Sequence, residues 1–154
     1  MIVRPATDKD AINACRVLRR SIIELCDDDH ANDSQRLSAW LANKTDANVR
    51  KWIDAAEQLV VVAEEGGRIM GVGAVMRSGE ITLNYVSPEA RFRGASKAML
   101  SHLETYLQSF RITRALLSST RTAHQFYLSR GYEDFGEPEF WAGMSAQPMV
   151  KNLS

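Results

Sequence analysis

An arginine-containing turn precedes a helix-like run at residues 91–100, RFRGASKAML. The first backbone amides of a helix have no partner within the helix, and they lie at the positive end of its dipole. Gly94 would let a ligand approach the backbone closely, and Arg91 and Arg93 could add charge-assisted hydrogen bonds to phosphate oxygens. The stretch therefore predicts a site for an anion such as a phosphate, with a solvated turn before a packed helix as the alternative. It is not a Walker A loop, because the Gly-Lys-Ser/Thr ending is absent.

The charge composition limits which partners the chain can have. Nineteen basic and nineteen acidic residues cancel over 154 positions, so no overall field attracts nucleic acid or anionic membranes. An anionic ligand must be held locally, and a nucleic-acid binder using Arg91 and Arg93 is disfavoured. The N-terminus, MIVRPATDKD, has no apolar leader, and no window approaches the roughly 20 apolar residues of a membrane span. We expect a soluble protein without a membrane partner.

The two cysteines, Cys15 and Cys26, are too few for a disulfide framework and match no metal-ligand spacing. This usage is typical of a reducing compartment, so we expect a cytoplasmic protein. We expect no metal site.

The hydrophobic pattern predicts one domain over residues 1–154. Thr7 is a candidate N-cap for a helix that ends near Leu25, after a strand at residues 2–5, and the stretch CDDDHANDSQ is a polar break. Further helices are expected at 34–43, 46–56, 94–110 and 122–130, and strands at 58–65, 68–76, 80–86 and 114–119, with two closing strands in 132–136 and 140–151. This order predicts an α/β (α+β) fold, in which helices cover both faces of a mixed, mostly antiparallel sheet.

Two segments together resemble the signatures of the GNAT superfamily of N-acetyltransferases. Residues 91–96, RFRGAS, are similar to its acetyl-CoA motif, [Arg/Gln]-x-x-Gly-x-[Gly/Ala]. Residues 120–132 are similar to its second segment, Asn-x-x-Ala-x-x-Phe-Tyr-x-x-x-Gly-Phe, with matches at Ala123, Phe126, Tyr127, Gly131 and Tyr132. The order of elements matches the family over essentially the whole chain. The resemblance implies a GNAT-type fold and acetyl-CoA as cosubstrate.

The resemblance also implies where coenzyme A would bind. Its pyrophosphate would rest on the loop of Arg91, Phe92, Arg93, Gly94, Ala95 and Ser96. Its pantetheine would lie between two strands that splay apart, one ending at Val86 and one at Ser118, where backbone groups near Tyr85 and Val86 would bind it. Two positions depart from the family pattern: Ser96 replaces Gly or Ala, and Thr120 replaces Asn, which puts one side-chain contact to the cofactor in doubt.

Acetyl transfer needs a neutral amine and a proton for the departing thiolate. Deprotonating a lysine-like amine at neutral pH costs about 4 to 5 kcal/mol. The resemblance implies that Tyr127 is the general acid that protonates the thiolate, whereas a core aromatic residue is the alternative. The general base stays open. Glu80 begins the strand before the cofactor loop, where members of the family sometimes have an acid, but a glutamate at a strand end is more often merely solvated.

Three other residues are candidates for contact with the substrate. Asn84 lies where the family usually has an apolar residue, and it could contact substrate, position water or be structural. Asp28 and His30 lie in the CDDDHANDS stretch, which in a GNAT fold would be close to the acceptor, although such a cluster could instead cap the next helix.

These observations predict an acetyl-CoA dependent N-acetyltransferase that acts on a primary amine of a small molecule or peptide by direct transfer. The alternative is a noncatalytic acyl-CoA binding or sensor module, which would need no tyrosine acid. The helices at residues 33–56, with Trp40 and Trp52, are expected to shape the acceptor pocket or the face of a homodimer.

Overall fold

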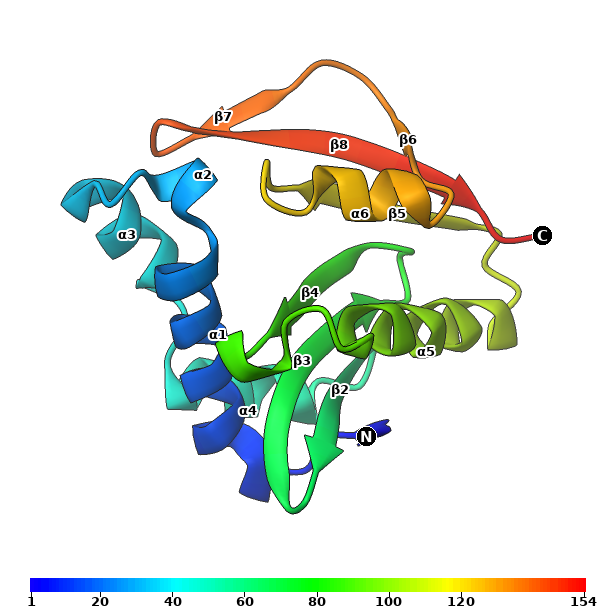
Figure 1. Cartoon of the computed structure of the whole chain (residues 1–154). Coiled ribbons are helices and arrows are strands. Elements are labelled where there is room, and N and C mark those ends of the chain that lie inside the picture. The colour runs from blue at the N-terminus through cyan, green and yellow to red at the C-terminus, as the bar shows by residue number, and fades with distance from the viewer.

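Two antiparallel sheets lie side by side in the computed structural model, which describes residues 1–154 (Figure 1). The first has strand order β1-β2-β3-β4, and in the second β8 pairs with β5, β6 and β7. Only one parallel bridge, Glu80 with Leu116, joins the sheets. The strands are β1 (Ile2–Pro5), β2 (Gln58–Glu65), β3 (Arg68–Met76), β4 (Ile81–Val86), β5 (Arg114–Ser119), β6 (Glu133–Asp134), β7 (Glu139–Trp141) and β8 (Met144–Asn152).

Helices cover both faces of the first sheet, as predicted. Helix α5 (Ala95–Ser109) covers one face, and α1 (Ala11–Leu25) and α4 (Asp46–Asp54) cover the other. The remaining helices are α2 (Asp27–His30), α3 (Ser34–Leu41) and α6 (His124–Ser129). Along β2, Val61 belongs to the core beneath α5, whereas Val60 and Val62 belong to the core beneath α1 and α4. A strand buried on both faces is apolar at consecutive positions, which explains the run LVVVA. None of these helices combines the length and the hydrophobicity that a membrane-spanning segment requires.

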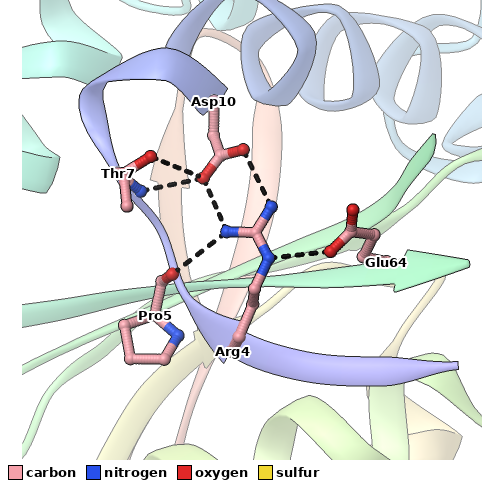
Figure 2. A network of polar contacts seen from close by, with 5 residues as sticks. All are labelled: Arg4, Pro5, Thr7, Asp10 and Glu64. Carbon is pink, nitrogen blue, oxygen red and sulfur yellow. Dashed lines mark hydrogen bonds and ion pairs between the residues drawn. The ribbon is translucent and has the colours of Figure 1, made fainter. Parts of the chain in front are cut away.

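A polar network fastens β1 to the start of α1 and to β2 (Figure 2). The Arg4 guanidinium donates to both carboxylate oxygens of Asp10, at 2.8 and 3.0 Å, and to Glu64 at 2.8 Å. Asp10 also accepts from the Thr7 amide at 2.8 Å, and the two residues form a capping box before the helix. Thr7 is the N-cap of a short 3-10 turn, Asp8–Asp10, whereas the N-cap of α1 itself is Asp10, so the predicted N-cap lies three residues too early.

The structure differs from the prediction in two segments. The polar break after Leu25 contains a short helix, α2, and the predicted strand at 140–151 is a hairpin of β7 and β8. The hairpin turns at Ala142 and Gly143, with φ values of 51° and 80°. Two consecutive residues with positive φ are typical of the tight turns that match the twist of paired strands.

Candidate active site

A cavity of about 450 Å³ opens between β4 and β5, where the two sheets separate. Beyond the Glu80–Leu116 bridge, no backbone hydrogen bond joins these strands. The cavity walls are the length of β4, the turn before α5, the end of β5 and one face of α6. The predicted gap between the strand ending at Val86 and the strand near Ser118 is therefore present as a cavity.

The turn before α5 presents backbone amides that have no partner in the chain. No hydrogen bond occupies the amides of Phe92, Gly94, Ala95 or Ser96, and these four residues line the cavity. Gly94 has a φ of 84°, and a Cβ atom added there would meet no atom within 4 Å. Open space beside unpaired amides at a helix start is the arrangement that binds phosphates.

Arg91 and Phe92 extend the same wall. Phe92 is 91% exposed and has a φ of 64°, which is unusual for a bulky residue. The Arg91 guanidinium lies 4.7 Å from the centre of its ring. Both side chains border the cavity, so a positive charge accompanies the free amides.

Arg93, in contrast, does not line the cavity. Its guanidinium donates to both carboxylate oxygens of Glu65, at 2.6 and 2.8 Å. The expectation that this side chain contacts phosphate is therefore wrong, because Arg93 is paired with an acidic residue at the end of β2 and does not line the cavity. The remaining cationic side chains on the cavity wall are Arg91 and Lys97.

Tyr127 lies on the opposite wall, on α6, and is only 7% exposed. Its ring contacts Phe126 and Tyr132 edge to face, at 5.2 and 5.7 Å between ring centres. The Tyr132 hydroxyl is fixed by donating to Glu104 at 2.8 Å. Burial raises the pKa of Tyr127 to about 12, and the neighbouring Asn84 side chain acts in the opposite direction. The phenol thus keeps its proton at neutral pH.

Asn84 faces the same space from β4. Its Oδ1 atom is buried and has no hydrogen-bond partner. Leaving a buried acceptor unpaired costs about 1 to 3 kcal/mol, so such an atom marks a place where a ligand can donate a hydrogen bond. Asn84 and its neighbours Tyr85 and Val86 pair with β3 on one edge only, and the other edge borders the cavity. This free edge suits a peptide-like ligand.

Three of the predicted substrate or base residues lie elsewhere. Glu80 and Asp28 are exposed and do not line the cavity. His30 is fully buried, because helix α2 turns it inward. Its Nε2 lies 2.9 Å from the Ile22 carbonyl oxygen, and its Nδ1 accepts from the Asn32 amide at 2.9 Å. His30 is therefore structural, and the expected substrate contact is corrected.

Sequence reasoning missed Asp29, the buried neighbour of these residues. Its carboxylate accepts from the amide of Arg121 at 2.7 Å and from the amide and hydroxyl of Thr122 at 3.2 and 2.6 Å. Thr120, which precedes them, lines the cavity, and its hydroxyl accepts from the Ala123 amide at 3.1 Å. Asp29 thus holds the turn that positions α6 and Tyr127. Three consecutive aspartates were the only signal, and they do not indicate which one turns inward.

Both cysteines are free and buried. Cys26 lines the cavity, and burial raises its pKa to about 12. Burial likewise raises the pKa of Cys15 to about 11. Neither thiol is a reactive nucleophile at neutral pH.

The sequence of the chain matches a known protein family. A family model described as an acetyltransferase (GNAT) domain matches residues 26–153. The chain belongs to the GNAT acetyltransferase family. Acetyl-CoA is the cosubstrate of this family. No curated protein sequence matches the chain.

Solved structures share the GNAT fold at low sequence identity. A GCN5-related N-acetyltransferase from Rhodopseudomonas palustris is 21% identical, with a TM-score of 0.87 over 98% of this chain and 94% of the other. The PaiA N-acetyltransferase from Thermoplasma acidophilum, solved with coenzyme A, is 16% identical, with a TM-score of 0.83 over 98% of each chain. The aminoglycoside 6'-N-acetyltransferase from Enterococcus faecium is 13% identical, with a TM-score of 0.76 over 100% of this chain and 98% of the other.

Proposed function

We propose that this GNAT domain transfers an acetyl group from acetyl-CoA to a primary amine by direct attack. One observation carries the proposal: a single cavity connects the unpaired amides of residues 94–96 with the buried phenol of Tyr127. The first feature suits a pyrophosphate and the second suits an acid at the thioester. The alternative of a noncatalytic acyl-CoA binding module has no need for a phenol at this position.

Residues along the cavity would bind different parts of the two substrates. Phe92, Gly94, Ala95 and Ser96 bind the pyrophosphate through their amides, and the free edge at Tyr85 and Val86 binds the pantetheine. Asn84 Oδ1 accepts a hydrogen bond from the incoming amine. Acetyl-CoA supplies an activated acyl carbon when bound.

Tyr127 completes the reaction. As the new bond between nitrogen and carbon forms and the bond between carbon and sulfur breaks, the Tyr127 hydroxyl donates its proton to the leaving sulfur. The amine loses one proton to solvent, and solvent returns a proton to the phenolate. Protons and electrons therefore balance over one turnover.

The substitution Tyr127→Phe tests the proposal, because it removes the donor and keeps the ring. We expect kcat to fall by about 100-fold, within the range of general acid catalysis, when free thiol release is followed with a panel of primary amines. The affinity for coenzyme A, measured by calorimetry, should change little. Tyr106→Phe is the matched control, since Tyr106 lies on α5 and its hydroxyl accepts only from Arg77, at 3.3 Å. A Tyr127→Phe protein with the parent's rate would remove the catalytic assignment.

A further inference from the structure

A second cavity, of about 160 Å³, lies next to the first. The two cavities share Tyr85, Ser118 and Thr120 as lining residues, so they meet at the gap between β4 and β5. Tyr127 and the unpaired amides border only the first cavity. An acyl transfer needs a second substrate that approaches the thioester from outside the cofactor site, and the second cavity supplies that approach.

Aromatic and apolar side chains form most of its walls. Trp40 of α3 is buried, and Trp141 of β7 is 57% exposed. Trp141 and Met144 are paired across the tight turn of the β7–β8 hairpin, and both line the cavity. Trp40, Trp141 and Tyr85 give the cavity aromatic walls, and aromatic surfaces bind apolar groups and organic cations.

Asp29 is the one charged side chain that lines this cavity, and it is 5% exposed. It accepts hydrogen bonds from the amides of Arg121 and Thr122 and from the Thr122 hydroxyl, but it forms no ion pair. A carboxylate has about four acceptor positions, so one is left after these three bonds. The buried charge therefore lacks a cation that a substrate ammonium can provide.

Two guanidinium groups lie around the same cavity. Arg121 donates to the hydroxyl of Ser145, a lining residue, at 3.3 Å, and Arg36 donates to the Asp29 carbonyl oxygen at 3.2 Å. A substrate with several ammonium groups would meet one carboxylate and two like charges. The charge pattern thus favours a single positive charge on the substrate.

We propose that this cavity is the acceptor site and that it selects a primary amine carried on an aromatic or bulky apolar group, with one positive charge. The inference rests on the proposed function, since it assigns the acceptor of that same reaction. The substrate enters as an ammonium ion that pairs with Asp29, and its apolar carrier packs against Trp40 and Trp141. Before attack the ammonium releases one proton to solvent, so that the neutral amine required by the proposed function reaches the thioester. The same features disfavour polyamines and aminoglycosides.

Tryptophan fluorescence tests the selection without relying on turnover. A Trp52→Phe protein keeps only Trp40 and Trp141, because Trp52 lies on α4 and does not line the cavity. Titrating this protein, with coenzyme A present, with 2-phenylethylamine, spermidine or kanamycin A should give a dissociation constant at least about tenfold lower for 2-phenylethylamine. Adding Trp141→Ala should weaken that binding by about tenfold, and Asp29→Asn should do the same.

Trp141→Ala keeps the test decisive if Asp29→Asn fails to fold, because Trp141 is half exposed. Tighter binding of spermidine or kanamycin A, or an unchanged 2-phenylethylamine affinity in the Trp141→Ala protein, would overturn the inference. Thiol release measured on the same amines separates the two proposals. Transfer that prefers a polycation refutes only the selectivity, whereas selective binding without transfer to any amine refutes only the proposed function.

Discussion

Gly94 and Gly66 share a left-handed backbone conformation, with φ values of 84° and 58°, but they differ in what surrounds them. Neither would bring a Cβ atom within 4 Å of another atom. Gly66 lies in the β2–β3 turn, whereas Gly94 lies beside the unpaired amides of the cavity. Comparing an alanine substitution at each glycine therefore separates its cost to the stability of the fold from its effect on ligand binding.

Replacing either glycine by alanine should destabilise the fold by about 1 to 2 kcal/mol, because alanine is disfavoured in this conformation. Only Gly94→Ala should also weaken coenzyme A binding, by about tenfold, since its methyl group would occupy the space beside the amides. Calorimetric titration of both variants checks this. Equal coenzyme A affinities in the two proteins would contradict the placement of the pyrophosphate.

The pH dependence of the reaction tests the role of Tyr127 as general acid. A general acid fails when it loses its proton, and burial raises the Tyr127 pKa to about 12. We expect kcat/KM for a primary amine to rise with pH as the amine becomes neutral, with no decline caused by Tyr127 below about pH 10. Initial rates between pH 6 and about pH 10 measure the profile, within the range where the protein stays folded. A decline centred near pH 8, absent from Tyr127→Phe, would show that the acid has a much lower pKa.

At the scale of elements, the Arg4 network makes the junction of β1, α1 and β2 sensitive to acid. Hydrogen bonds from Arg4 are the main reason that the pKa of Asp10 is lowered. A lowered folded-state pKa stabilises the protein fully above the unfolded value, near 3.9, and the contribution is lost as pH falls through the folded value.

The substitution Asp10→Asn should therefore lower the free energy of unfolding by about 1.5 to 3 kcal/mol at pH 7. The difference from the parent should shrink as pH falls below about 4, because the parent loses the same charge. Urea unfolding at several pH values measures it. Asp28→Asn is the matched control, since Asp28 is exposed, and a similar loss in that variant would show that the effect is not specific to the network.

The sequence predicts the helices and strands well, but it does not predict contacts between side chains that are far apart in the chain. Helix α5 and strands β2, β3 and β4 follow from local hydrophobic periodicity and from turn residues such as Gly66 and Gly67. The role of Asp29 does not, because its partners lie more than 90 positions along the chain. The predicted phosphate contact of the Arg93 side chain was wrong for the same reason, because its partner, Glu65, is 28 positions away. Motif spacing picked out the turn before α5 and Tyr127, which line one cavity, but side-chain direction depends on contacts between distant segments.

At the scale of the whole molecule, the two sheets meet at one backbone bridge, and a ligand between them would join their free edges. Coenzyme A at 100 times its dissociation constant should stabilise the fold by about 2.7 kcal/mol, which raises Tm by about 5 to 10 °C. Thermal unfolding with and without the ligand measures this shift.

Hydrogen exchange then locates the effect. Coenzyme A should slow exchange at residues 84–86 and 92–96, whereas the turn at Gly66 and Gly67 serves as an internal control. Slowing confined to α1 and α4 would contradict binding in the gap.

The two buried cysteines also make this chain convenient to label. Since neither thiol is exposed or acidic, a maleimide dye would react at one place only, at a cysteine introduced on the surface. A Glu139→Cys protein would carry the dye on β7, the strand of the hairpin that also bears Trp141. Its emission would report acceptor binding in real time, without any native cysteine having to be removed.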